Sequence, residues 1–117
     1  MKNSIDQSLH YIRKNKETMA TIYLKENDQK IAQKLFCYMY AWDNEYKVVN
    51  ETTNLDEIKD CDLVLVASED MFLKDFNEYY NVEKELKQKG IKLEIAINET
   101  NEEEYMERAL DLFKKAF

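Results

Sequence analysis

Apolar and polar residues alternate in recognisable blocks along the second half of the chain. Residues 63–67 read LVLVA, a continuous apolar run typical of a strand covered on both faces. Apolar residues then recur at helical spacing from Phe72 to Leu86, and Gly90 stands where a helix C-cap is expected. Residues 91–97 alternate again and predict a second strand. This order predicts a right-handed βαβ unit with parallel strands.

The first half of the chain has a similar order of elements. The β-prone segment at residues 21–24 predicts a strand, and residues 29–43 predict a helix that Asn27 or Asp28 can cap. A second strand is expected at residues 46–49, followed by a short turn over residues 55–59. The helix residues expected to face the core are Ile31, Leu35, Tyr38, Met39 and Trp42.

Helices are also expected at both ends of the chain. Ile5, Leu9 and Ile12 share one helical face within residues 1–16. Thr100 and Glu103 have the spacing of a capping box, which predicts a C-terminal helix over residues 100–117. Its apolar stripe consists of Met106, Ala109, Leu110, Phe113, Ala116 and Phe117.

Together these elements predict a single resolvase-like or flavodoxin-like α/β domain over residues 1–117. An N-terminal helix (1–16) precedes an α/β core (20–97) and a C-terminal helix (100–117). We expect three layers around a four-stranded parallel sheet of order 2-1-3-4. Ligands of such sheets lie beyond the carboxyl ends of the strands. The residues expected to line that crevice are Lys25, Glu26, Asn27, Asp28, Glu51, Glu69, Asp70 and Lys74.

Composition narrows the possible functions. The net charge of −7 over 117 residues opposes a basic nucleic-acid footprint, so no direct nucleic-acid contact is expected. One glycine and no proline exclude glycine-rich phosphate loops, and the single histidine, His10, excludes a multi-histidine metal site. Cys37 and Cys61 lie in apolar segments and are expected to be buried, reduced thiols. Because no apolar run is long enough for a membrane span, we expect a cytoplasmic protein. Because the motifs named above are missing, we expect neither a metal nor a cofactor.

Two phrases of the chain carry a resemblance to a known family. The phrases are IYLKENDQKIAQKLFCYMYAWDNEYKVVNE and CDLVLVASEDMFLKD, and the similarity spans residues 20–97. They resemble the N-terminal domain of serine recombinases, the resolvase and invertase family. That family has Tyr-x-Arg-x-Ser on its first strand, a glutamine-bearing helix, and a later strand that ends in Asp-Arg-x-x-Arg. The resemblance places the family's active-site positions at Lys25, Asn27, Asp70, Met71 and Lys74.

Most of the family's reactive groups are replaced at these positions. Asn27 stands where the family has its nucleophilic serine, and Lys25 stands where it has an arginine. In the second motif Asp70 is kept, whereas Met71 and Lys74 replace arginines. Phosphodiester cleavage by this route needs a nucleophile and a cluster of cations around the phosphate. The resemblance therefore implies a degenerate domain that is not an enzyme.

Three functions remain open from the sequence. The first is a pseudoenzyme that regulates a recombinase or another mobile-element process by protein contact, with a partner or as a homodimer. Its candidate interface on the C-terminal helix is Met106, Leu110, Phe113 and Phe117. The second is a small enzyme or Mg²⁺-binding domain with an acidic pocket made by Glu26, Asp28, Glu69 and Asp70. The third is an acidic, phage-type inhibitor of a nucleic-acid-binding protein.

Overall fold

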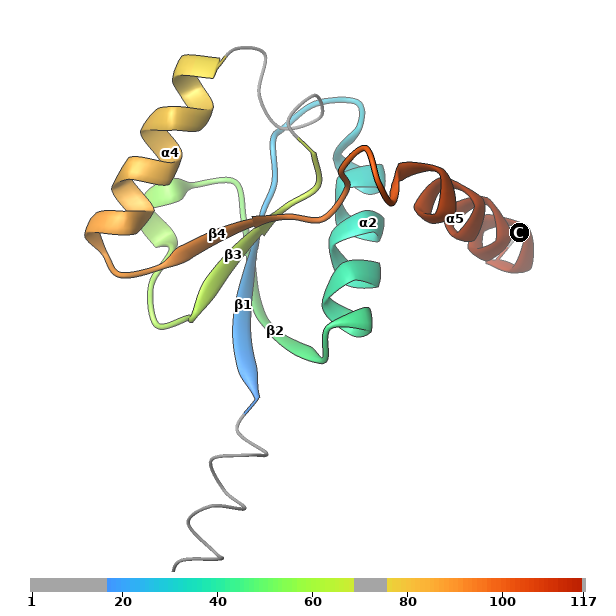
Figure 1. Ribbon diagram of the computed structural model, residues 1–117, viewed down its shortest axis with the longest axis horizontal. Helices are drawn as coiled ribbons and strands as arrows, with labels where there is room; N and C mark the ends of the chain where they lie inside the picture. Colours follow the sequence, from blue (N-terminus) through green and yellow to red (C-terminus); the bar gives the residue numbers. More distant parts are fainter. Residues whose placement is uncertain (1–16, 69–75, 117) are drawn as a thin grey trace, which may run out of the picture.

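The computed structural model describes residues 17–68 and 76–116 and contains one parallel sheet (Figure 1). The strand order β2-β1-β3-β4 confirms the predicted α/β topology. The strands are β1 (Thr18–Tyr23), β2 (Tyr46–Thr52), β3 (Leu63–Val66) and β4 (Lys92–Ile95). The helices are α2 (Lys30–Asp43), α4 (Phe76–Gln88) and α5 (Glu102–Ala116), with a 3₁₀ turn η1 (Leu55–Glu57). The predicted helix within residues 1–16 lies outside the described residues.

The sheet is covered on both faces, as the apolar run at residues 63–67 predicts. Leu63 and Leu65 of β3 pack in the core beneath α2 and α5, while Val64 and Val66 pack with residues of α4. All four side chains are buried. Figure 1 shows α2 and α4 on opposite sides of the sheet, which gives three layers.

Two strands, β1 and β2, are longer than predicted. β1 begins at Thr18 rather than at residue 21, and β2 continues to Thr52 rather than ending at residue 49. The extension follows backbone pairing, since Thr18 pairs with Tyr46 and Tyr23 with Thr52 across a register shift in β1. Polar residues such as Glu51 take part in this ladder, so side-chain pattern alone does not reveal it. β2 and β4 form the two edges of the sheet.

The only glycine terminates α4 as predicted. Gly90 has a φ of +74°, its N–H bonds to the Lys87 carbonyl at 3.0 Å, and the Ile91 N–H bonds to the Leu86 carbonyl at 2.9 Å. This pair of bonds is a Schellman motif, in which glycine takes the left-handed position without steric cost. β4 begins directly afterwards, at Lys92.

The orientation predicted for α2 is wrong for three of its five residues. Ile31, Tyr38 and Trp42 are exposed, whereas Met39 is buried and Leu35 is partly buried. The residues of α2 that are buried are Gln33, Phe36, Cys37, Met39 and Ala41. Apolar residues occur on two sides of this helix, and a polar glutamine on the inner side hid the true core face.

Two smaller expectations also need correction. Cys37 is buried as expected, but Cys61 is only partly buried at the edge of the α4-side core. α5 begins at Glu102, and the side-chain hydrogen bonds just before it are made by Asn98 and Asn101 rather than by Thr100 and Glu103. The Asn98 carboxamide accepts from the Thr100 N–H at 2.8 Å, and the Asn101 carboxamide accepts from the Asn98 N–H at 2.8 Å.

Candidate functional site

A buried glutamine of α2 holds the loop that follows β1. The Gln33 side chain is fully buried, and its Oε1 accepts a hydrogen bond from the Lys25 N–H at 2.9 Å. Its Nε2 donates to the Lys25 carbonyl at 3.2 Å and to Oδ1 of Asn27 at 3.0 Å. One amide therefore satisfies both backbone groups of Lys25 and fixes the position at which the resemblance places the active-site serine.

Asn27 has a structural role in this loop. Its Oδ1 accepts from the Gln29 N–H at 2.8 Å as well as from Gln33. The N-cap residue of α2 is Gln29, whose side chain makes no capping bond. Neither Asn27 nor Asp28 is therefore the N-cap, because the helix begins at Lys30, one residue later than predicted. The carboxamide of Asn27 instead closes the turn that leads into α2.

Beside this loop, acidic groups are paired with cations and a phenol. Glu26 forms an ion pair with Lys30, and Glu51 forms one with Lys34 at 2.9 Å. The Tyr38 hydroxyl also donates to Glu51. Hydrogen bonds from Tyr38 and then from Lys34 hold the pKa of Glu51 below its usual value. Burial, reinforced by the Glu51 carboxylate, raises the pKa of Tyr38 to about 12.

A depression of about 280 Å³ lies beside these ion pairs, at the C-terminal end of β2. Its lining residues are Leu24, Glu26, Lys30, Lys34, Glu51, Thr52, Thr53 and Glu57. Only Glu26 and Glu51 belong also to the crevice predicted from sequence. β2 extends to Thr52, and the buried Thr52 hydroxyl donates to Glu57 at 2.7 Å, which holds Glu57 of η1 at the edge of the depression.

The second half of the predicted site lies outside the described residues. Glu69, Asp70, Met71 and Lys74 belong to the segment 69–75. Of the predicted acidic pocket, the described residues are Glu26, which is paired with Lys30, and the exposed Asp28. Within residues 17–68 and 76–116 there is no group of three or more histidine, cysteine or acidic residues arranged to hold a metal ion.

α5 is attached to the C-terminal end of α2 by charge-assisted contacts that the sequence did not reveal. The Arg108 guanidinium donates to both carboxylate oxygens of Asp43, at 2.6 and 3.0 Å, and the Tyr105 hydroxyl donates to Asp43 at 3.0 Å. The Arg108 contact holds the pKa of Asp43 below its usual value. Tyr105 and Ala109 are buried beneath this contact.

A second polar cluster joins α2 to both edges of the sheet. Tyr40 donates to the Glu94 carboxylate at 2.8 Å, and Tyr46 donates to it at 3.0 Å. Burial, followed by the bonds to Glu94, raises the pKa of both tyrosines. Because Glu94 lies 48 residues from Tyr46 and 54 from Tyr40 in the sequence, no local motif marks the cluster.

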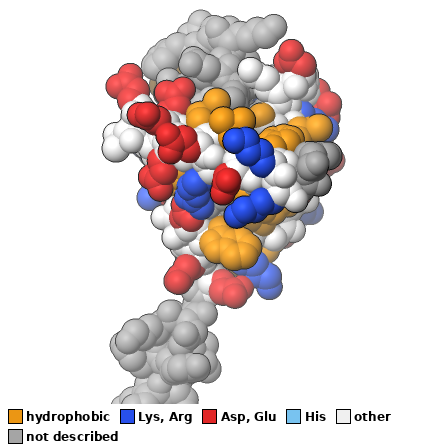
Figure 2. Space-filling view, turned by 90° about the vertical axis from the view of Figure 1, so that its right-hand side faces the viewer, with side chains coloured by type: hydrophobic (Ala, Val, Ile, Leu, Met, Phe, Trp, Pro, Cys, Tyr) orange, Lys and Arg blue, Asp and Glu red, His pale blue; other side chains and the backbone are white. Residues whose placement is uncertain are grey.

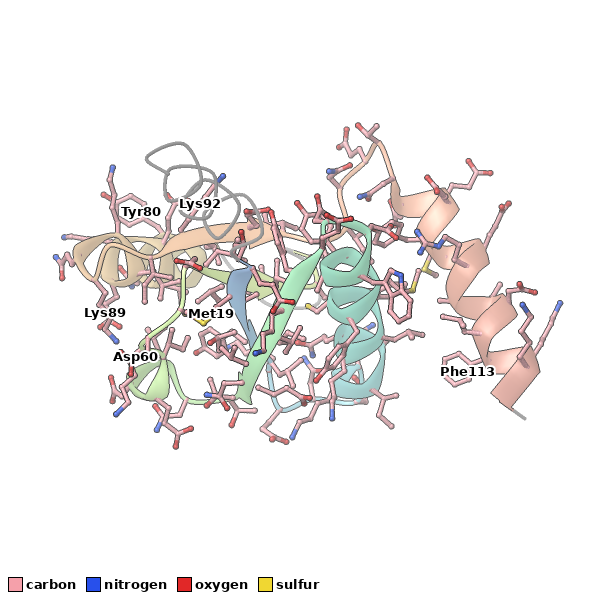
Figure 3. All side chains as sticks on the ribbon, turned by 90° about the horizontal axis from the view of Figure 1, so that it is seen from below. Met19, Asp60, Tyr80, Lys89, Lys92 and Phe113 are labelled. Carbon is pink, nitrogen blue, oxygen red and sulfur yellow. The ribbon has the colours of Figure 1, made fainter. Side chains whose placement is uncertain are left out.

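The candidate interface residues of α5 that can be described are exposed. Met106, Leu110 and Phe113 have exposed fractions of 46, 60 and 44%. Figure 3 shows Phe113 on the side of α5 that faces α2. On α2 itself, Trp42 is 84% exposed. Phe117 lies outside the described residues.

Comparison with known proteins bears on the fold. No protein-family model matches the sequence, and no curated protein matches it. A solved structure does match: the C-terminal catalytic domain of ISC1926 TnpA, an IS607-like serine recombinase. The two share 24% identity with a TM-score of 0.53, over 82% of this chain and 79% of that one. In the described part of the chain, none of the helices has the length and apolar character needed to cross a bilayer. The chain has a serine-recombinase-like fold.

Proposed function

We propose that this chain is a non-catalytic, serine-recombinase-like domain that acts by contact with another protein, in the regulation of a recombinase or another mobile-element process. The observation that carries the proposal is the role of Asn27. Its carboxamide stands where the resemblance expects a nucleophilic hydroxyl, and its oxygen holds the Gln29 and Gln33 donors in place. A carboxamide cannot form the covalent phosphoserine-type intermediate that this chemistry requires.

The charges around Asn27 favour the same proposal. Lys25 offers a single ammonium where the family has a guanidinium, so the paired hydrogen bonds to a phosphate are lost. The nearby cations Lys30 and Lys34 are already paired with Glu26 and Glu51. With a net charge of −7, the chain as a whole repels a DNA backbone.

Exposed apolar side chains on α5 favour binding to a protein. Met106, Leu110 and Phe113 form an exposed apolar stripe along α5, a helix that the Asp43–Arg108 ion pair attaches to the domain. Contiguous exposed apolar surface of this kind is characteristic of protein interaction sites. The partner in this proposal binds the α5 stripe.

Pull-down from the native host tests the proposal. We expect the wild-type chain to retain a recombinase or another mobile-element protein, identified by mass spectrometry, and Phe113→Asp to lose it. Asn81→Asp, which adds the same charge at an exposed position of α4, is the matched control and is expected to behave like the wild type. Equal capture by Phe113→Asp would contradict the role of α5.

A cleavage assay tests the absence of catalysis separately. The purified chain is incubated with supercoiled plasmid carrying the host DNA around its own gene, and protein–DNA adducts are sought after denaturation. We expect none. An adduct that forms with the wild-type chain would refute the proposal, whatever the pull-down shows.

A further inference from the structure

α2 carries a second apolar stripe, on the side that faces away from the sheet. Ile31, Leu35, Tyr38 and Trp42 follow one another at intervals of four, three and four residues, the spacing that places side chains in one row of a helix. Trp42 and Ile31 are 84 and 73% exposed, Tyr38 is 40% exposed, and Leu35 is partly buried. We call these four residues the α2 stripe. It is separate from the α5 stripe that the proposed function uses.

The α2 stripe lies between β2 and α5. On one side of it Tyr38 bonds to Glu51 of β2, and on the other Asp43 bonds to Arg108 of α5. Figure 2, which looks onto the side of the molecule formed by α2 and α5, shows hydrophobic side chains exposed there among charged ones. A surface helix normally has one apolar face, so a second face at coiled-coil spacing indicates a second helix packed on it.

The sequence of residues 1–16 contains a stripe of matching spacing. Ile5, Leu9 and Ile12 are separated by four and three residues, so the helix expected there has one apolar row. This row and the lower part of the α2 stripe both cover seven residues in two steps, so they stay in step when the helices run parallel. The facing pairs are then Ile12 with Trp42, Leu9 with Tyr38, and Ile5 with Leu35.

The chain enters the domain beside the C-terminal end of α2. Thr18, the first residue of β1, pairs with Tyr46, the first residue of β2, and β2 follows α2 directly. Residues 13–17 can extend over roughly 17 Å, which exceeds the diameter of about 10–12 Å of a helix with its side chains. A helix of the twelve residues before them is roughly 18 Å long, close to the rise of roughly 17 Å from Ile31 to Trp42. The segment therefore reaches the α2 stripe at Trp42 and has the length to cover it.

Charge is divided unequally between residues 1–16 and the rest of the chain. Residues 1–16 have a net charge of +3, from Lys2, Arg13, Lys14 and Lys16 against Asp6. Residues 17–117 carry −10, which gives the whole chain its −7. Opposite net charges attract the segment to the domain. Glu45, exposed in the turn between α2 and β2, lies where the basic residues 13–16 would pass.

We propose that residues 1–16 pack as a helix on the α2 stripe of the same chain and cover it. The connection is short, so the effective concentration of the segment at the stripe is on the order of 1 mM. A contact too weak to hold a separate peptide therefore suffices. A second copy is a poorer source of the segment, because two chains of charge −7 repel each other. The contact closes α2 to other proteins and leaves the α5 stripe open to the partner of the proposed function.

Fluorescence of Trp42, the only tryptophan, tests the contact in the full-length chain. An indole that is 84% exposed emits like tryptophan in water, whereas a covered indole emits at shorter wavelength. We expect the wild type to show a covered indole, and Leu9→Glu to shift the emission to the red and increase quenching by acrylamide. Gln7→Glu adds the same charge on the opposite side of the expected helix and is the matched control, which keeps the wild-type emission. Identical emission of the wild type and Leu9→Glu would overturn the inference.

Disulfide formation tests the register and the source of the segment. In the double variant Ile12→Cys, Trp42→Cys, oxidation is expected to link positions 12 and 42 within one chain, seen as a monomer on a non-reducing gel and as a linked peptide pair by mass spectrometry. Ile12→Cys, Asn81→Cys places the second thiol on α4 and is expected not to link. Both variants also carry Cys61→Ser, so that this partly exposed thiol does not compete. Linked dimers, or no link between positions 12 and 42, would overturn the inference.

The outcomes are distinct from those of the proposed function. Leu9→Glu leaves the α5 stripe unchanged, so it is expected to capture the same partner as the wild type. A failed pull-down together with a link between positions 12 and 42 overturns the proposed function alone. Capture through Phe113 by a chain whose Trp42 emits as an exposed indole overturns this inference alone.

Discussion

Replacing Gln33 by leucine removes the amide that holds the β1–α2 loop. Leucine has a similar volume, so the core packing of α2 is kept and the change concerns hydrogen bonding. The substitution deletes three hydrogen bonds, two to the backbone of Lys25 and one to Asn27. The backbone groups of Lys25 are partly buried, so water replaces the lost partner incompletely.

The expected cost follows from these three bonds. A buried hydrogen bond contributes about 1 kcal/mol net, and an unsatisfied group costs about 1–3 kcal/mol. Access of water to Asn27, which is exposed, and the added apolar atoms of leucine offset part of this. We expect Gln33→Leu to lower the free energy of unfolding by about 2–3 kcal/mol, and the melting temperature by roughly 10 °C.

Urea denaturation and amide hydrogen exchange measure the effect. Exchange should accelerate most at the Lys25 amide, whose acceptor is the Gln33 side chain. Gln29→Leu serves as the control, since Gln29 is exposed and its side chain makes no capping bond. We expect this control to change stability by less than about 0.5 kcal/mol.

The reasoning is refuted if Gln33→Leu is as stable as the control. It is refuted equally if stability falls while the Lys25 amide keeps its protection, because the cost would then come from core packing and not from the loop.

Three further predictions concern ionisable groups. Asp43→Asn should cost about 1 kcal/mol at neutral pH, discounted for the exposure of the ion pair. The pKa of Asp43 is lowered on folding, so its contribution is present above the unfolded pKa of about 3.9 and is lost as pH falls through the folded pKa; urea melts at pH 7 and pH 3 test this. Tyr40→Phe removes a donor to Glu94 and should cost about 1–2 kcal/mol. The raised pKa of Tyr40 means that this contribution is lost as pH rises above about 10, and alkaline melts in which the cost stays constant would contradict it. An aromatic disulfide reagent should label Cys61 in the native protein and Cys37 only after unfolding, because burial raises the pKa of the Cys37 thiol; rapid native reaction of both would disprove the assignment.

The sequence was most informative where the physical constraint is local. The apolar run of β3 has to be buried on both faces, and Gly90 ends α4 because glycine reaches its φ of +74° without strain. These two features predict the βαβ unit, whereas the strand order 2-1-3-4 was expected by analogy with flavodoxin-like folds and is confirmed by the structure. The family resemblance also led to the correct fold, because the order of elements is shared with a recombinase domain.

The orientation of α2 and the polar contacts between distant residues could not be predicted from local sequence in this way. α2 carries apolar residues on two sides, and only the packed sheet decides that Phe36 faces inward while Trp42 faces solvent. Glu94 meets Tyr40 and Tyr46 across three separate elements, so its partners have no fixed sequence spacing. The role of Gln33 was similarly hidden, because a buried polar residue interrupts the apolar pattern that identifies a core face.

The two edge strands of the sheet carry side chains that oppose aggregation. Edge strands present unpaired backbone groups to which another chain can add a strand, and natural proteins discourage this with charged side chains, lysine above all. Here β2 and β4 each carry an exposed lysine, Lys47 and Lys92. Desolvating either ammonium would oppose edge-to-edge growth into fibrils. Lysine at these two positions thus restricts non-specific aggregation along the sheet edges.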